Sequence, residues 1–260
     1  MPAALDSSPN HGWNAHAGDP DAQASLYLDM IAGSTYADAL VPALDTRFHD
    51  VLDVGAGGGT LTRRCLVDGG QWTAVEPNRT MGRALAEAAL ALRARRIRFT
   101  HLPCTWEALP DGVVADTVLA ANIGAAHHTA EVLFSALAPR ARREMIWIVA
   151  AQEGPSTFCL AGMLPPELHL ADTTPAYLRT LAQLGPGRAP QEIAFADWEC
   201  RMHFSSTAAA LDHFLSRLDT PRDSARGQAI DRHLLSLLTP STDGVLARCP
   251  KRSAILRWTF

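Results

Sequence analysis

Apolar and polar positions follow one another in short blocks along this chain, and each block has the period of a strand or of a helix. Short apolar or β-branched runs predict buried strands, and apolar residues three or four positions apart predict the buried face of a helix. Met81, Leu85, Ala88 and Leu92 form the clearest helical face. The strands expected on this basis are 48–54, 72–76, 97–102, 113–121, 145–151, 193–204 and 253–260. The expected helices are 22–44 with a break near Gly33, 60–67, the segment after Asn78, 130–138, 174–184, the segment after Ser206, and 229–238.

The order of these elements predicts the architecture. Strands and helices alternate as far as Gln152, which is typical of a parallel sheet with helical crossovers. We therefore predict an α/β protein with a mostly parallel sheet of seven strands, helices on both faces, and an antiparallel edge formed by the last strands. Three parts are expected: an N-terminal arm and helical lid at 1–44, a ligand-binding core at 45–152, and a C-terminal part at 153–260. The last part is expected to complete the sheet and to carry insertions after the fifth strand and between the sixth and seventh, which would form a pocket.

Composition narrows the possible partners. The chain has 260 residues, of which 47% are hydrophobic and 19% are charged, so it can bury a sizeable core. The formal net charge is −4, which provides no overall positive field for nucleic acid or for an anionic membrane. All the basic side chains except Lys251 are arginines. Together with the many alanines, this bias indicates a GC-rich bacterial genome.

The cysteines and the ends of the chain bear on the compartment. Five cysteines are scattered along the sequence without a C-x-x-C pair. This spacing argues against a disulfide framework or a structural zinc site, and it fits a reducing compartment. The sequence shows neither a secretory leader nor an apolar run of the roughly 18 residues that a spanning helix needs. We therefore expect a cytoplasmic protein with no metal site, no membrane partner and no nucleic-acid partner.

The most informative segment runs from Val51 to Thr60, where a predicted strand leads through four glycines into a predicted helix. Glycines let the backbone turn tightly and approach a ligand closely, and the N–H groups at a helix start favour an anionic group. Glu76 ends the next strand, 21 residues after Gly55, where a carboxylate can accept hydrogen bonds from both hydroxyls of a ribose. A structural glycine-rich turn is the plain alternative, but the order of strand, loop, helix, strand and acidic end favours nucleoside binding.

NAD is the first rival ligand for this loop. A dinucleotide site requires G-x-G-x-x-G, and Thr60 occupies the last of these positions here. The carboxyl group of Asp53, two residues before Gly55, also suits a cationic aminoacid-sulfonium ligand better than a pyrophosphate.

At this point the chain resembles a known superfamily. Asp53-Val54-Gly55-Ala56-Gly57-Gly58-Gly59 is similar to the first motif of class I S-adenosylmethionine-dependent methyltransferases, and Glu76-Pro77-Asn78 is similar to their acidic second motif. The similarity extends over about 45–152 and implies a Rossmann-like methyltransferase fold with S-adenosyl-L-methionine as cofactor. It also implies that Gly55 and Gly57 pass close to the ligand, that Asp53 helps to hold its ammonium group, and that Glu76 binds the ribose. The cofactor-binding residues expected from the resemblance are Asp53, Gly55, Ala56, Gly57, Glu76, Pro77, Thr105, Trp106 and Asn122.

Two of these positions are candidates for contact with adenine, and one of them has an equally plain structural interpretation. After the third strand the family often has an acidic residue near the adenine amino group, and this chain has Thr105 and Trp106 there. We take Thr105 and the backbone of Trp106 as candidates for contact with adenine, although Trp106 is as easily explained as a core aromatic residue.

The methyl acceptor is expected beyond the fourth strand, where small residues leave room for a ligand. Asn122 is a candidate to bond the acceptor or the methionine part of the cofactor, and His127 or His128 is a candidate base because an imidazole titrates near neutral pH. A helix-capping or solvated role for the two histidines is the alternative. Tyr27, Met30 and Tyr36 either form a lid over the cofactor or belong to the core.

These observations predict a methyltransferase that acts on a small-molecule acceptor, at O or N. The preference for a small acceptor comes from the lack of a basic groove, of an Asn-Pro-Pro-Tyr-type motif and of an appended recognition domain. One alternative is a methyltransferase-like protein that binds the cofactor and transfers nothing. A more distant alternative is an NAD-dependent oxidoreductase.

Overall fold

The computed structural model of the protein describes residues 20–123, 129–153, 163–168, 174–218 and 220–260. The helices are α1 Pro20–Ala32, α2 Tyr36–Leu44, α3 Thr62–Cys65, α4 Arg79–Ala91, α5 Ala130–Leu137, α6 Ala176–Leu184, α7 Thr207–Arg217 and α8 Ala225–Leu237. The strands are β1 Phe48–Val54, β2 Leu66–Val75, β3 Arg98–Leu102, β4 Ala115–Ala121, β5 Ala141–Ala150, β6 Glu192–Phe204, β7 Leu238–Ser241 and β8 Gly244–Thr259.

All of these strands belong to one sheet. Their order is β3-β2-β1-β4-β5-β8-β6, and β7 pairs with β8 beside this path. The first five strands are parallel, whereas β8 runs antiparallel to β5, β6 and β7. This arrangement confirms the predicted Rossmann-like methyltransferase fold with its antiparallel edge, and the short β7 adds an eighth strand to the seven expected.

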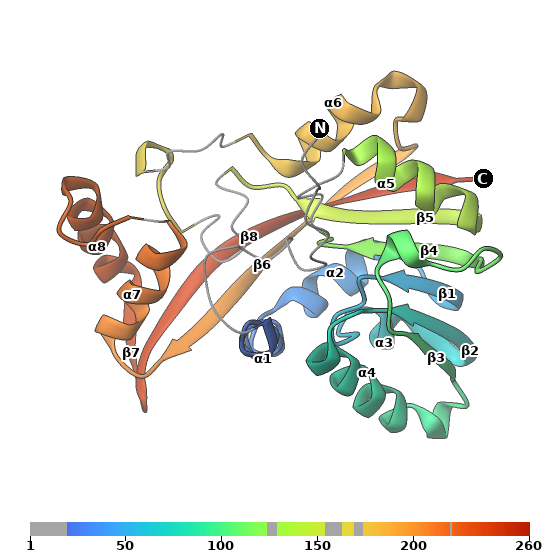
Figure 1. Ribbon diagram of the computed structural model, residues 1–260, viewed down its shortest axis with the longest axis horizontal. Coiled ribbons are helices and arrows are strands. Elements are labelled where there is room, and N and C mark those ends of the chain that lie inside the picture. Colours follow the sequence, from blue (N-terminus) through green and yellow to red (C-terminus); the bar gives the residue numbers. More distant parts are fainter. Residues whose placement is uncertain (1–19, 124–128, 154–162, 169–173, 219) are drawn as a thin grey trace, which may run out of the picture.

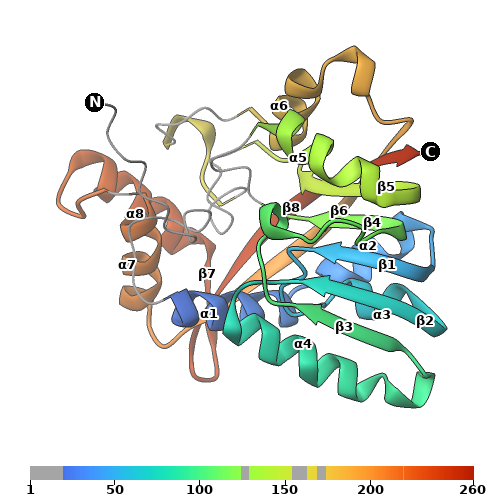
Figure 2. The same cartoon turned by 45° about the vertical axis from the view of Figure 1, so that its right-hand side comes forward.

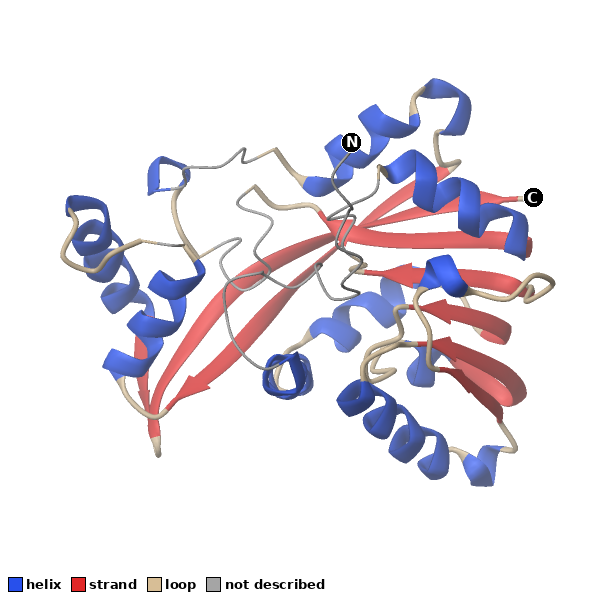
Figure 3. Cartoon of the chain, viewed as in Figure 1, coloured by secondary structure: helices blue, strands red, loops and turns tan. Residues whose placement is uncertain are grey.

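Two hydrophobic cores lie on the two faces of the sheet. The first core packs the sheet against α1, α2, α4, α7 and α8 and includes the fully buried Trp72 and Phe214. The second core packs the other face against α5 and α6 and includes Leu137 and Trp147. Figures 2 and 3 show helices on both sides of the sheet. The predicted face of α4 is confirmed for Met81, Leu85 and Ala88, which are all buried, whereas Leu92 caps the helix and is only partly buried.

The pair β6–β8, which we call the ribbon, extends beyond the parallel strands. It pairs from Glu192 with Arg257 as far as Phe204 with Val245, while β5 pairs only with the segment 253–259 of β8. The far end of the ribbon carries α7, α8 and β7, on the left in Figure 1. Insertions after β5 and between β6 and β8 were expected, and both are present. The Ser206 hydroxyl caps α7 by accepting from the Ala209 N–H.

Two sequence predictions about element length are wrong. The helix predicted over 60–67 is only the four-residue α3, because Leu66 pairs with Phe48 and begins β2. The last strand was predicted at 253–260, but β8 already begins at Gly244. Pro250 disguised this start, since proline usually interrupts a strand. It is tolerated here because it lies opposite Glu199, whose backbone N–H and carbonyl bond Thr35 instead of β8.

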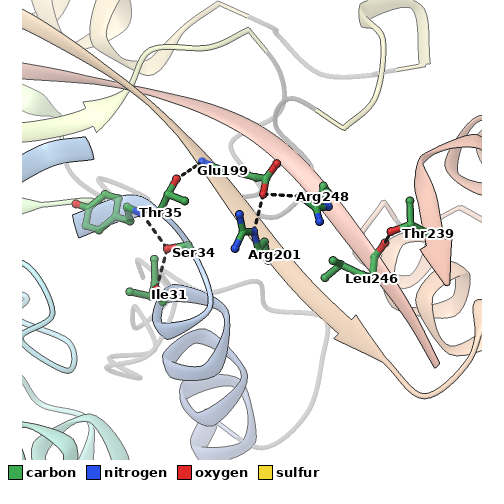
Figure 4. A network of polar contacts seen from close by, with 9 residues as sticks. Ile31, Ser34, Thr35, Glu199, Arg201, Thr239, Leu246 and Arg248 are labelled. Atoms are coloured by element: carbon green, nitrogen blue, oxygen red, sulfur yellow. Dashed lines mark hydrogen bonds and ion pairs between the residues drawn. The ribbon is translucent and has the colours of Figure 1, made fainter. Parts of the chain in front are cut away.

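The N-terminal helices are fastened to the ribbon at the turn between them. The Thr35 N–H donates to the Glu199 carbonyl (3.0 Å). The Glu199 N–H donates to the Thr35 hydroxyl (2.8 Å), as Figure 4 shows. The Glu199 carboxylate in turn accepts from Arg201 and Arg248 (2.5 and 3.3 Å). These two bonds with Glu199 of β6 fix the turn between α1 and α2 on the ribbon. Both helices are therefore held against the first core.

Candidate functional site

The candidate site lies at the edge of the sheet where β1, β2 and β4 end. The glycine loop follows β1, Glu76 follows β2, and Asn122 follows β4. Since β1 lies between β2 and β4 in the sheet, these three features are neighbours. Ligands of open α/β sheets bind at this carboxyl edge.

Glu76 ties the glycine loop to the end of β2. Its Oε2 accepts from the Gly57 N–H (3.0 Å) and its Oε1 accepts from the Asn78 N–H (2.9 Å). Only 8% of the residue is exposed. Burial raises the pKa of its carboxyl group, and the two backbone hydrogen bonds oppose this shift. A carboxylate offers about four acceptor positions, so Glu76 retains acceptor capacity for a ligand while it also holds the loop.

Asp53 lies beneath the loop and is buried more deeply. Its Oδ2 accepts from the Trp72 indole N–H (3.3 Å), and the Thr62 hydroxyl also donates to its carboxylate. Burial raises the pKa of Asp53 from 3.8 to about 6, against the effect of these two hydrogen bonds, and the nearby Glu76 charge raises it further. Two buried carboxyl groups therefore make this edge of the sheet electrostatically attractive to a cation.

The loop glycines serve different purposes. Gly59 has φ +69°, and a Cβ there would lie 2.4 Å from the Trp72 ring, so this position packs the loop onto the core. Gly57 has φ +54°, and a Cβ there would meet Tyr27 at 3.8 Å, which is ordinary contact. The protein's own atoms therefore leave room for a Cβ at Gly57. Its positive φ still favours glycine.

Helix α1 covers the loop. A Cβ on Gly58 would lie 2.5 Å from Leu28, and the Thr80 hydroxyl of α4 donates to Asp21 of α1 (2.9 Å). Tyr27 of α1 is partly buried, and its pKa is raised by burial and then by the Glu76 charge. Tyr27, Met30 and Tyr36 thus belong to the first core, and Tyr27 also faces the loop.

Asn122 bonds the N-terminal helices. Its Nδ2 donates to the Tyr36 hydroxyl (3.0 Å), and its backbone N–H donates to the Ile148 carbonyl (2.9 Å). Asn122 has φ +55°, a left-handed conformation that asparagine tolerates better than most residues. Tyr36 is buried, which raises the pKa of its phenol. The sequence contains no signal for this pair, because 86 positions separate its members.

The remaining predicted residues are placed as follows. Pro77 is exposed beside Glu76. Thr105 precedes the short helix Trp106–Ala108, and Trp106 packs on the second core while it stays partly exposed. His127 and His128 lie outside the described residues. The structure therefore brings together Asp53, the glycine loop and Glu76, and it adds Tyr36 to Asn122.

A separate cleft opens at the opposite edge of the sheet. It is lined by residues at the starts of β1, β4 and β5, among them Arg47, Asp116, Arg143 and Glu144. Its mixed charges and its position at the amino ends of the strands distinguish it from the candidate site. Within the described ranges, no cluster of His, Cys, Asp or Glu is suited to a metal ion. None of the described helices has the length and apolar character needed to span a bilayer.

Comparisons with known proteins find distant structural similarity. No family model matches the chain, and no curated protein matches it by sequence. Geranyl diphosphate C-methyltransferase from Streptomyces coelicolor A3(2) is 15% identical, with 96% of this chain and 89% of that chain covered and a TM-score of 0.47.

Two further solved structures give similar values. An S-adenosylmethionine-dependent methyltransferase from Thiobacillus denitrificans, in complex with S-adenosyl-L-homocysteine, is 15% identical over 84% of this chain and 88% of that chain, with a TM-score of 0.44. The YcgJ protein from Bacillus subtilis is 16% identical over 85% and 95%, with a TM-score of 0.43. Similarity at this level carries no argument about ligand or reaction, which rest on the site itself.

Proposed function

We propose that the protein is an S-adenosylmethionine-dependent methyltransferase that acts on a small-molecule acceptor, at O or N. The observation that carries this proposal is the Glu76 carboxylate, which is held at the carboxyl edge of β2 against the Gly57 amide. It combines acceptor capacity for ribose hydroxyls with a direct bond to the loop that would lie under the ligand.

Each residue of the site has a role in this proposal. Glu76 binds the ribose hydroxyls, and the backbone of Gly55, Ala56 and Gly57 passes beneath the ligand. Asp53 attracts the ammonium group, directly or through water, with the negative charge that it carries above its raised pKa. The adenine is expected near Pro77, Thr105 and Trp106.

The bound cofactor supplies a methyl group already activated on a sulfonium, so the chain mainly has to position the acceptor. Asn122 is suited to orient the acceptor or the methionine part, since its side chain is held by Tyr36 at the end of β4. His127 and His128 stay our candidates for a base where the acceptor must lose a proton.

NAD fits this site less well. A pyrophosphate is usually bound at the N-terminus of a helix after the glycine loop, and α3 here has only four residues. Buried Asp53 and Glu76 also disfavour a polyanionic ligand. A protein that binds the cofactor without transferring its methyl group would share the same crevice. Turnover of radiolabelled S-adenosylmethionine with small-molecule fractions of a lysate distinguishes this alternative.

Glu76 provides the direct test. In calorimetric titrations with S-adenosylhomocysteine, we expect Glu76→Ala to bind about 10- to 1,000-fold more weakly, because up to two charge-assisted hydrogen bonds are lost. Glu76→Gln keeps one carbonyl acceptor and should lose less. Glu76→Ala should also lower the free energy of unfolding by about 1–3 kcal/mol, since the Gly57 and Asn78 amides lose their partner.

The matched control is Glu87→Ala, which removes an exposed carboxylate from α4. It should leave both affinity and stability unchanged. NADH titrated under the same conditions should give no binding heat. Equal affinity for S-adenosylhomocysteine in the wild type and in both Glu76 variants would contradict the proposed ribose contact, and binding of NADH alone would contradict the proposed cofactor.

A further inference from the structure

The cleft at the amino edge of the parallel strands lies away from the candidate site and has no role in the proposed function. It has a volume of about 380 Å³ and lies where the loop before β1 meets the starts of β4 and β5. This volume is within the range of pockets that bind small molecules. Every residue that lines the cleft is polar or charged, so a ligand has to be held there by hydrogen bonds and by charge.

Both acidic residues of the cleft already have partners. The Asp116 carboxylate accepts from the Arg142 guanidinium (2.9 Å). One Glu144 oxygen accepts from the Thr117 hydroxyl (3.0 Å), and the other lies 3.7 Å from the Arg257 guanidinium. Neither arginine lines the cleft, so the negative charge of its wall is compensated from outside.

Arg142 and Arg257 are each shared with a further carboxylate. Arg142 also pairs with Asp50, and Arg257 also pairs with Glu192. These two arginines therefore carry no spare positive charge, and binding of an anion depends on the basic residues that line the cleft itself.

Three basic side chains in the wall of the cleft have no carboxylate partner among the described residues. Arg47 donates to the main-chain carbonyl of Arg64 (2.9 Å), which is a neutral group and leaves the charge of Arg47 uncompensated. Within the same described ranges, the side chains of His49 and Arg143 make no hydrogen bond or ion pair. All three basic residues are exposed, so their donors are open to a ligand in the cleft.

We propose that this cleft is a second ligand site, which binds a small phosphate monoester that also carries hydroxyl groups. The planar N–H donors of Arg47 and Arg143 match the oxygens of a phosphate group, and His49 adds a donor when it is protonated. Asp116 and Glu144 keep free acceptor positions for hydroxyl groups, because a carboxylate offers about four of them. An anion without hydroxyl groups would meet these two carboxylates without bonding them.

Ribose 5-phosphate is the probe for this site. In calorimetric titrations of the full-length protein at low ionic strength, without phosphate in the buffer, we expect saturable binding with one site per chain. Ribose lacks the phosphate and should give no binding heat. Inorganic phosphate lacks the hydroxyl groups and should bind more weakly than ribose 5-phosphate. Lack of saturable binding of ribose 5-phosphate would overturn the proposal, and so would ribose or inorganic phosphate binding with equal affinity.

Two variants of the cleft and one control locate the binding. Arg143→Met and Arg47→Met should each weaken binding of ribose 5-phosphate at least about tenfold, because each removes charge-assisted hydrogen bonds. Arg143→Met should fold like the wild type, since its exposed side chain makes no hydrogen bond or ion pair with the described residues. Arg232→Met removes an exposed arginine from α8, at the far end of the ribbon in Figure 1, and should bind as the wild type does. Unchanged affinity in Arg143→Met would count against the proposal, as would an equal loss in Arg232→Met.

Saturating S-adenosylhomocysteine separates this site from the proposed function. The cleft and the glycine loop lie at opposite edges of the sheet, so affinity for ribose 5-phosphate should be the same with and without S-adenosylhomocysteine. Displacement of ribose 5-phosphate by S-adenosylhomocysteine would place the probe in the crevice and overturn the proposal. Failure of S-adenosylhomocysteine to bind would contradict the cofactor and leave the comparison of Arg143→Met with the wild type unaffected.

Discussion

The crevice at the glycine loop and the buried face of the ribbon differ in both charge and construction. The crevice holds the carboxyl groups of Asp53 and Glu76, whereas the ribbon face holds the ammonium group of Lys251. The crevice is assembled from one stretch of chain, residues 53–78, through hydrogen bonds between neighbouring strand ends. The ribbon face is assembled from β6, β8 and the N-terminal helices, which lie far apart in the sequence.

The negative charge of the crevice suits a cationic cofactor. Asn122 and Tyr36 form the junction between the regions, because they connect the end of β4 to the helices that rest on the ribbon. The predictions below test the crevice first and the junction last.

The largest effect is expected inside the loop. At Gly59 an alanine Cβ would overlap the Trp72 ring at 2.4 Å with φ +69°, so Gly59→Ala should lower the free energy of unfolding by about 3 kcal/mol or more. At Gly57 the Cβ has ordinary contacts, and Gly57→Ala should lose only about 1–2 kcal/mol from its left-handed backbone. Urea denaturation followed by circular dichroism measures both values.

Gly57→Ala should lose less stability than Gly59→Ala, but it should lose more affinity for the ligand. Folded Gly57→Ala should bind S-adenosylhomocysteine more weakly than the wild type, because its left-handed backbone favours glycine and its amide holds the Glu76 carboxylate. Equal stability losses at Gly57 and Gly59, with unchanged affinity in Gly57→Ala, would show that the loop has one structural role throughout.

The crevice could be predicted from sequence because its determinants are local. A strand, a glycine loop and an acidic residue at the next strand end occur in order within 48–76, and parallel pairing of consecutive strands brings them together. The length of α3 could not be predicted in this way. Leu66 and Val67 fit a helix as well as a strand, and pairing with Phe48 decides in favour of the strand.

A second, pH-dependent effect is expected at Asp53. Its pKa is about 6 in the folded protein and near 3.8 in the unfolded chain. Between these values the native state holds a proton that the unfolded chain has released, so the free energy of unfolding falls as the pH rises through this window. Asp53→Asn has no such proton. It should therefore gain stability over the wild type by up to about 3 kcal/mol above pH 6, since each pKa unit corresponds to about 1.4 kcal/mol.

Ligand binding should depend on the same titration of Asp53, but here the ionised form is the favourable one. Only ionised Asp53 attracts an ammonium group, so wild-type affinity for S-adenosylhomocysteine should rise from about pH 5 to about pH 7. Asp53→Asn should bind more weakly at the upper end and show a flatter profile. Asp111→Asn, at an exposed turn, is the control and should follow the wild type. Parallel profiles for Asp53→Asn and the wild type would exclude Asp53 from ammonium binding.

The ribbon was harder to predict than the crevice. Apolar and polar residues alternate only from Ala247 to Cys249. Pro250 argues against a strand, and the bonds between Glu199 and Thr35 explain why it is accepted. Lys251 is recognisable in the sequence as the single lysine, yet its burial depends on pairing with β6. The aromatic contact between Tyr36 and Trp198 joins positions that no periodic pattern relates.

The smallest effect is expected at the junction of the two regions. Tyr36→Phe removes the hydroxyl that accepts from Asn122, and Asn122→Gly removes the donor while it relieves the positive φ. In a double-mutant cycle, the combined loss of unfolding free energy should be smaller than the sum of the single losses by about 1 kcal/mol, the usual contribution of one hydrogen bond.

Tyr177→Phe is the matched control, because its ring packs on Phe195 at the other face of the ribbon. Its loss should add to that of Asn122→Gly without coupling. The same double-mutant cycle, measured as affinity for S-adenosylhomocysteine, then shows whether the hydrogen bond between Tyr36 and Asn122 affects ligand binding in the crevice. Strict additivity for Tyr36 and Asn122 in both measurements would mean that this hydrogen bond does not couple the two regions.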